Sequence, residues 1–129
     1  MTCSDILTMA VNLLAEEKGG AATLSEFSER APFILAAFCG EARIIDKRYR
    51  EAFMLDEQPA FDKTRLTADS AFPLCDRLAG AAACYLASTL IVDENPSISD
   101  IFGERCRDAL ESAYGEIPFD RHSIVNVYP

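Results

Sequence analysis

The chain has 129 residues, of which 50% are hydrophobic and 26% are charged, and it carries a formal net charge of −9. This composition is typical of one globular domain and excludes a disordered chain. The negative charge argues against a protein that grips nucleic-acid phosphates, because such binding needs clustered Lys and Arg.

Helical periodicity begins close to the first residue. In residues 4–17 the apolar side chains recur at three-and-four spacing, and Ser4 is placed to cap the start. Gly19 and Gly20 end the pattern. The opening MTCSDIL has no basic region and no cleavage-type site, so we expect no signal peptide.

Two further helical segments are predicted before residue 54. Thr23 and Glu26 form a T-x-x-E capping box for a short turn of helix. Pro32 either starts the next helix or kinks a continuous one. That helix is long and amphipathic, reaches about Phe53, and has Gly40 as its weak point. Its expected apolar positions are Phe33, Ile34, Ala37, Phe38, Ile44, Ile45 and Tyr49.

Residues 54–76 contain two prolines and no sustained period, which predicts the longest loop of the chain. A loop of this length in a compact domain usually has a function or contains a short element.

An uncharged stretch follows this loop, from Leu78 to Val92. It is too short to cross a bilayer and has charged residues on both sides. A buried strand is the alternative, but the stretch is too long and too rich in alanine for one. We therefore predict a central helix over residues 77–92, surrounded by other helices because it is apolar on all sides.

The last predicted helix covers residues 97–114. Asn95 is a good N-cap, Pro96 suits the first helical position, and Gly115 ends the helix. The short connection requires this helix to run antiparallel to the central one. Its expected apolar stripe is Ile98, Ile101, Phe102, Cys106, Ala109, Leu110, Ala113 and Tyr114.

The sequence thus predicts an all-α fold, a small bundle of four to five helices over residues 1–116, with a short extended C-terminal tail over 117–129. The tail has an apolar end that is too short to form a core alone. It needs another surface, on its own domain or on a neighbouring copy. The apolar residues of this end are Ile124, Val125, Val127 and Tyr128.

The cysteines do not suggest a metal site. Zinc sites usually draw their ligands from close pairs, and these five are widely spaced without a CxxC. An odd count without a secretory signal indicates reduced thiols in a cytosol, used as small buried hydrophobic residues. They are Cys3, Cys39, Cys75, Cys84 and Cys106.

Other chemistry is weakly supported. His122, the single histidine, lies in the tail between Arg121 and Ser123, and nothing local indicates that a carboxylate holds it against an activated nucleophile, as a catalytic triad needs. Two carboxylate pairs at i,i+3 spacing resemble those that hold Mg²⁺ in helical nucleotide pyrophosphohydrolases. However, the second pair falls outside the apolar stripe of its helix, and a solvated acidic face is the simpler interpretation. The pairs are Glu26 with Glu29 and Asp108 with Glu111.

One basic cluster, ARIIDKRYR, stands out in this acidic chain. Arg43, Lys47 and Arg50 lie at i, i+4 and i+7 on one helix face, with Arg48 nearby. This face is a candidate patch for an acidic partner surface, including another copy of the chain. The alternative is ion pairing within the helix to neighbouring carboxylates. Those carboxylates are Asp46 and Glu51.

The order of these features resembles the small head–tail connector proteins of tailed bacteriophages and prophages. Four pieces carry the resemblance: the opening ILTMAVNLL; the step SERAPFILAAFCGEARIIDKRYR; the run FPLCDRLAGAAACYLASTLIVDENPSISDIFGERCRDALE; and the ending IVNVYP. Together they span most of the chain, whereas the loop at 54–72 and the cysteines are not part of the pattern.

The resemblance implies a non-enzymatic structural protein without a cofactor. Such connectors form a ring under the portal that extends the DNA channel toward the tail, without specific DNA binding. It implies a location in the bacterial cytoplasm during assembly and then in the virion. A ring needs two different patches on each copy. The basic face at 43–50 is expected to meet Asp93 and Glu94, or the acidic region 104–116, of a neighbour.

Two other functions are kept as alternatives. One is an acidic helical regulatory module that captures a basic partner protein. The other is a helical metal-dependent nucleotide hydrolase that uses the two carboxylate pairs.

Overall fold

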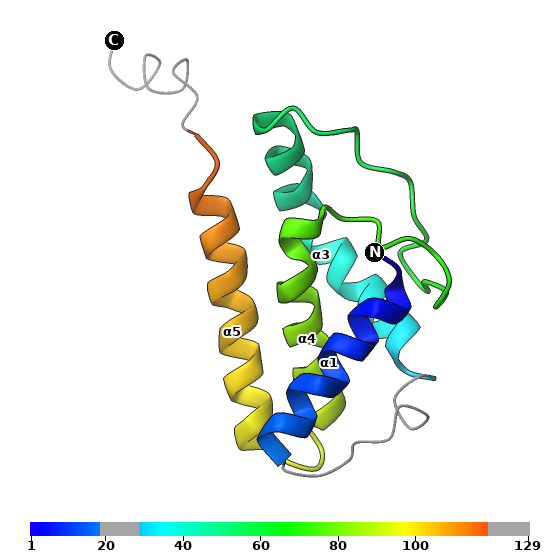
Figure 1. Ribbon diagram of the computed structural model, residues 1–129, viewed down its shortest axis with the longest axis vertical. Coiled ribbons are helices and arrows are strands. Elements are labelled where there is room, and N and C mark those ends of the chain that lie inside the picture. Colours follow the sequence, from blue (N-terminus) through cyan, green and yellow to red (C-terminus); the bar gives the residue numbers. More distant parts are fainter. Residues whose placement is uncertain (19–28, 119–129) are drawn as a thin grey trace.

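The computed structural model describes residues 1–18 and 29–118. Within these residues the chain forms four α-helices and no strand, which confirms the predicted all-α bundle (Figure 1). The predicted helical turn at Thr23 and Glu26 lies outside the described residues. The elements are α1 (Cys3–Lys18), α3 (Ala31–Ala52), the 3-10 turn η1 (Asp76–Leu78), α4 (Ala79–Ile91) and α5 (Pro96–Gly115).

Helix α1 is capped by Thr2, and the prediction that Ser4 caps it is wrong. The backbone N–H of Thr2 donates to Oδ2 of Asp5 at 2.8 Å, and the N–H of Asp5 donates to Oγ1 of Thr2 at 3.3 Å. This reciprocal capping box satisfies donors that the first turn leaves open, so the helix begins earlier than predicted. The hydrogen bond from the Thr2 backbone N–H, followed by one from the Thr2 side chain, lowers the pKa of the Asp5 carboxyl.

Helix α3 begins with Pro32 in its first turn, so the proline starts the helix. The predicted apolar face was partly wrong, because Phe33 is 50% exposed and Ile44 is 60% exposed. Small side chains and one carboxylate, Asp46, form most of the buried face instead. The buried residues of α3 are Ala31, Leu35, Ala36, Phe38, Cys39, Ala42 and Asp46.

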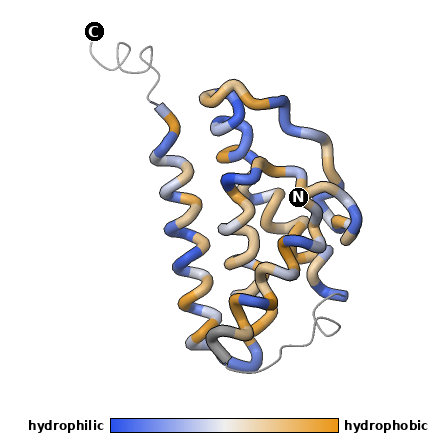
Figure 2. The backbone as a smooth tube through the Cα atoms, viewed as in Figure 1, coloured by the Kyte–Doolittle hydropathy of each residue, from blue (hydrophilic) through white to orange (hydrophobic). Residues whose placement is uncertain are grey.

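Helix α4 is the central element, as predicted, and it contacts α1, α3 and α5. Its hydrophobic character is visible in the middle of the bundle (Figure 2). The prediction of burial on every side was wrong in detail, because Gly80 is exposed and Tyr85 and Ser88 are half-buried. This half-open side borders the space between α3 and α5.

Helices α4 and α5 run antiparallel, as predicted from their short connection (Figure 1). Asn95 caps α5 by accepting a hydrogen bond from the N–H of Ile98 at 3.2 Å. Two serines join the helices. Oγ of Ser88 donates to the carbonyl of Ser99 at 2.8 Å, and Oγ of Ser99 donates to the carbonyl of Ser88 at 2.8 Å. Such small side chains allow the two backbones to lie close together.

The loop over residues 54–76 is held against the starts of two helices. The N–H groups of Cys3 and Ser4, in the first turn of α1, donate to the carbonyls of Ser70 and Ala68 at 3.0 Å each. The N–H of Leu66 donates to the carbonyl of Pro32 at 3.1 Å, in the first turn of α3. The loop therefore provides carbonyl acceptors for backbone N–H groups in the first turn of α1, which have no acceptor within the helix. None of the helices in the described ranges is long and apolar enough to cross a membrane.

Candidate interaction site

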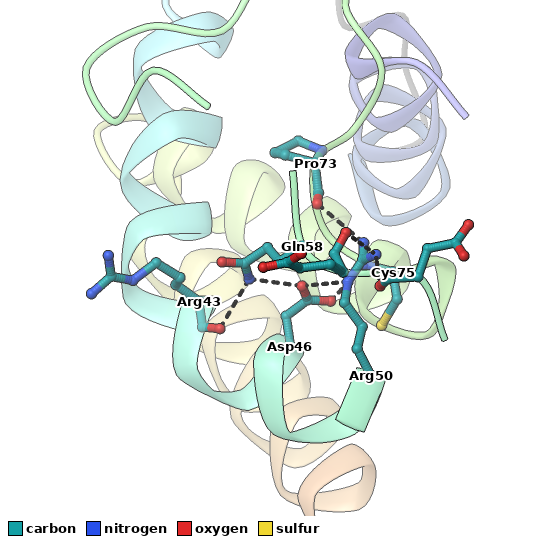
Figure 3. A network of polar contacts seen from close by, with 8 residues as sticks. Arg43, Asp46, Arg50, Gln58, Pro73 and Cys75 are labelled. Atoms are coloured by element: carbon teal, nitrogen blue, oxygen red, sulfur yellow. Dashed lines mark hydrogen bonds and ion pairs between the residues drawn. The ribbon is translucent and has the colours of Figure 1, made fainter. Parts of the chain in front are cut away.

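The main polar cluster of the described chain is built around Asp46, which is 0% exposed. Its Oδ1 accepts the backbone N–H of Cys75 at 2.7 Å. Its Oδ2 accepts from Nε of Arg50 and from Nε2 of Gln58, each at 2.8 Å (Figure 3). A buried carboxylate is very unfavourable without partners, and these donors supply them. We call these four residues the Asp46 network.

The network follows from the helical repeat of α3. Asp46 lies on the core face of the helix, and Arg50 lies one turn later on the same side. Gln58 and Cys75 come from the two ends of the following loop, which therefore must close against α3. Gln58 also donates to the carbonyl of Arg43 at 3.1 Å. The loop is thus fixed to the last two turns of α3.

Arg50 extends this attachment through its guanidinium group. Its Nη1 donates to the carbonyl of Asp56 at 2.8 Å, and its Nη2 donates to the carbonyl of Pro73 at 3.2 Å. Arg50 was predicted to belong to a basic patch for a partner, whereas its side chain binds within its own chain. The alternative from the sequence, a pair with Asp46, is the arrangement observed at 2.8 Å. A pair between the basic cluster and Glu51 is not among the described contacts.

The chain leaves α3 through a strained turn. Met54 has a φ of 56°, in the left-handed region that usually requires glycine. The N–H of Leu55 donates to the carbonyl of Arg50 at 2.9 Å, which closes a Schellman-type helix end. Phe53, Met54 and Leu55, called here the apolar turn, are 43%, 93% and 46% exposed. Figure 2 shows this hydrophobic turn at the end of α3.

A groove of about 690 Å³ lies beside the apolar turn, between the last turn of α3 and residues 72–77. We call it the α3-end groove. Phe53 and Leu55 of the apolar turn form one part of its lining, together with Tyr49 of α3. Phe72 and Leu74 line it from the loop. Asp56, Asp76, Arg50 and Arg77 supply its charges.

The Asp46 network lies directly against this groove, because Arg50 and Cys75 belong to both. The groove is therefore held in shape by buried hydrogen bonds before any partner arrives. Such preorganisation reduces the entropy that is lost on binding.

The end of α5 is fixed beside the same groove. Nε of Arg77 donates to both carboxylate oxygens of Glu116, at 3.0 Å and 2.8 Å. This contact joins η1 to the residue that follows α5, so the chain leaves the described structure close to the groove. It also raises the pKa of the Arg77 guanidinium.

The structure does not bring the two predicted charged patches together within one chain. Arg43 and Lys47 are exposed on α3, whereas Asp93 and Glu94 lie in the turn at the opposite end of the bundle (Figure 1). Arg48 instead donates to the hydroxyl of Tyr114 on α5 at 3.3 Å. The predicted tail residues Ile124, Val125, Val127 and Tyr128 lie outside the described residues, as does His122.

The carboxylate pairs do not converge in the part of the chain that the structure describes. Glu29 is exposed just before α3, and Asp108 and Glu111 are exposed on α5, as the sequence indicated. Glu26 lies outside the described residues. Among the described residues, no group of three or more His, Cys, Asp or Glu side chains is placed to hold a metal ion.

A second groove, of about 420 Å³, lies between α3, α4 and α5. We call it the α3–α5 groove. The rings of Phe38 and Tyr85 meet there, with centroids 5.4 Å apart. Glu41, Asp100 and Glu104 line it together with Arg107. This groove therefore combines aromatic rings with an acidic lining.

The cysteines behave as the sequence predicted. Four of the five are buried, Cys84 is half-buried, and none is in a disulfide. Burial raises the pKa of the Cys39 thiol to about 12 and that of Cys106 to about 11. Burial, and next the neighbouring Asp46 carboxylate, raise the pKa of the Cys75 thiol to about 11. These thiols stay protonated and weakly nucleophilic near neutral pH.

The α3-end groove was not predicted from the sequence, and Asp46 was predicted only as a possible ion-pair partner. The available signal was local: an aspartate directly after two isoleucines, with an arginine four residues later. The positive φ of Met54 had no signal, because its residue type argues against that conformation.

The described residues form a small all-α bundle with an exposed apolar turn beside a groove at one end. Searches against protein-family models, curated proteins and solved structures found no match to this chain.

Proposed function

We propose that this protein is a non-enzymatic assembly subunit of the phage head–tail connector type, which associates with copies of itself and docks between portal and tail proteins. The observation that carries the proposal is the apolar turn, which presents Phe53, Met54 and Leu55 to solvent on a rigid support. Exposed apolar side chains in one place are typical of protein–protein contact sites.

The charge distribution supports assembly from different patches. Arg43 and Lys47 are exposed on α3, and Asp93 is exposed at the other end of the bundle. Two complementary patches at separate places cannot pair within one copy, but they suit the head-to-tail contacts of a ring. A net charge of −9 also suits a channel through which DNA slides without sticking.

Sedimentation velocity over a concentration series tests the proposal. We expect the full chain to form assemblies of several copies as concentration rises, and we expect Met54→Asp to shift the transition to higher concentration. The matched control is Thr64→Asp, which adds the same charge at an exposed loop residue outside the α3-end groove. A chain that stays monomeric at every concentration would contradict the proposal.

The acidic alternative rests on the α3–α5 groove. Glu41, Asp100 and Glu104 surround aromatic rings there, which suits a cationic side chain of a basic partner. Fluorescence anisotropy with a labelled oligoarginine peptide tests this function. The variant with Glu41→Gln and Glu104→Gln should bind more weakly than a control with the same charge loss elsewhere. That control carries Asp69→Asn and Asp108→Asn, and equal weakening in both variants argues against this function.

A further inference from the structure

The α3-end groove lies next to a strained residue, Met54. Its volume of about 690 Å³ is bordered by Phe53 and Leu55, which remain 43% and 46% exposed. Met54 between them is 93% exposed and holds a backbone conformation that glycine adopts without strain. A large apolar side chain at a position that favours glycine points to a contact outside the described bundle.

We propose that the α3-end groove is the acceptor for residues 119–129 of a second copy of this chain. This inference rests on the proposed function, because it names the contact through which the copies associate.

The composition of that segment matches the groove. It reads FDRHSIVNVYP, with Ile124, Val125, Val127 and Tyr128 as an apolar end. The groove offers apolar walls to such side chains. Arg121 precedes the apolar end, and two exposed carboxylates line the groove, whose two arginines, Arg50 and Arg77, already bind acceptors within their own chain. These carboxylates belong to Asp56 and Asp76.

The place where the described chain ends allows this contact. The Arg77–Glu116 ion pair fixes the chain beside the groove, two residues before the described structure ends at Pro118. Residues 119–129 span at most about 36 Å when extended, at roughly 3.3 Å per residue. This length is on the order of the diameter of a small domain, so the segment is long enough for a contact with an adjacent copy.

A second copy, rather than the same chain, follows from the proposed self-association, because a groove that accepts the segment of another copy provides the two different patches that head-to-tail assembly needs. A contact between two different surfaces is heterologous, and its repetition closes a ring. Occupation by the chain's own segment would instead cover the groove and leave both surfaces unavailable to a neighbour.

Photocrosslinking in the full chain tests the inference. Met54 is replaced by p-benzoylphenylalanine, and a mixture of ¹⁴N- and ¹⁵N-labelled protein is irradiated and digested with trypsin. Cleavage after Arg121 releases HSIVNVYP, so the product is identified by mass. We expect crosslinks between position 54 and this peptide that contain both isotopes. The same probe at Lys63, an exposed loop residue, should not give them.

The outcomes separate the two proposals. If position 54 crosslinks to HSIVNVYP only in products that contain one isotope, the segment binds the groove of its own chain. This result would overturn the inference that a second copy supplies the segment. Mixed-isotope crosslinks from position 54 to other regions would overturn the groove assignment while leaving self-association intact. Absence of mixed-isotope crosslinks in a monomeric protein would overturn both.

A substitution in the segment gives a second measurement that does not touch the described bundle. Val125→Asp should weaken self-association about tenfold or more, because it places a charge at an apolar contact. Asn126→Asp adds the same charge at a polar residue and should change the association constant much less. Equal effects of the two variants would overturn the inference.

Discussion

The backbone N–H of Cys75 donates to Oδ1 of Asp46 at 2.7 Å, across a separation of 29 residues. This bond joins the last turns of α3 to the residue that precedes η1. Arg50 and Gln58 donate to the other oxygen of the same carboxylate. One buried side chain therefore fixes both ends of the 54–76 loop.

Removal of this carboxylate should strongly destabilise the fold. Asp46→Ala leaves three donors without their acceptor, and we expect the free energy of unfolding to fall by about 3 kcal/mol. Urea unfolding followed by circular dichroism measures this loss. Asp108→Ala, at an exposed position of α5, should change stability by less than about 0.5 kcal/mol. Similar losses in both variants would contradict the role given to Asp46.

Arg50→Lys should loosen the loop while the helices stay folded. A single ammonium group cannot reach the Asp46 carboxylate and the carbonyls of Asp56 and Pro73 at the same time. We expect faster hydrogen exchange at the amide of Cys75, and no change at the amide of Ile98, which Asn95 caps. The control variant is Arg43→Lys. Unchanged exchange at Cys75 would show that Arg50 does not hold the loop.

Substitutions of Met54 should affect the stability of the fold and the self-association of the chain differently. Met54→Gly relieves the left-handed backbone strain and should raise the free energy of unfolding by about 0.5–1 kcal/mol. Met54→Ala keeps the strain and should leave stability nearly unchanged. Both variants remove the exposed side chain, so both should weaken self-association in sedimentation experiments. Equal unfolding free energies for the two variants would argue against strain at this residue.

Gly40 is predicted to lower the stability of α3, and replacing it should raise that stability. It lies inside the helix, and a Cβ added there would meet nothing within 4 Å. Gly40→Ala should therefore raise the free energy of unfolding by about 0.5–1 kcal/mol. Gly103→Ala is the comparison, because its added Cβ would lie 3.5 Å from Oγ of Ser88. A distance of 3.5 Å is an ordinary van der Waals contact, so thermal unfolding should show a gain for Gly103→Ala as well, and a loss of stability in Gly40→Ala would contradict the open environment of that position.

The buried thiols should make the fold less stable in alkali. The unperturbed thiol pKa is 9.0, and burial raises it to about 12 for Cys39 and about 11 for Cys106. Above pH 9 the unfolded chain therefore releases these protons while the folded chain keeps them, so stability falls as pH rises toward these folded-state values. Urea midpoints should be steady near neutral pH and decline between pH 9 and 11. The decline should be shallower in Cys39→Ala, and an identical slope would exclude this thiol as a cause.

The local signals in the sequence predicted the helices well. Asn95 and Pro96 start α5 where the capping pattern indicates, and the uncharged stretch after Leu78 forms the central helix. Caps and helical periods depend on neighbours within a few residues. For this reason their positions are readable without knowledge of the fold.

The orientation of α3 was less readable. The apolar period favoured burial of Phe33 and Ile44, yet both are half or more exposed, and Asp46 is buried instead. An isolated helix does not reveal which of two apolar faces meets the core. The choice here depends on the small residues of α4 and on donors from Gln58 and Cys75.

By itself the sequence determined an all-α chain, the approximate ends of its helices, the antiparallel pair α4 and α5, and the burial of most cysteines. Only the tertiary structure decided that Asp46 lies in the core, that Arg50 holds the loop, and that an apolar groove opens beside Met54. The reason is physical: helix formation is governed by contacts along a few residues. A buried carboxylate, in contrast, is stable only where donors distant in the chain converge on it.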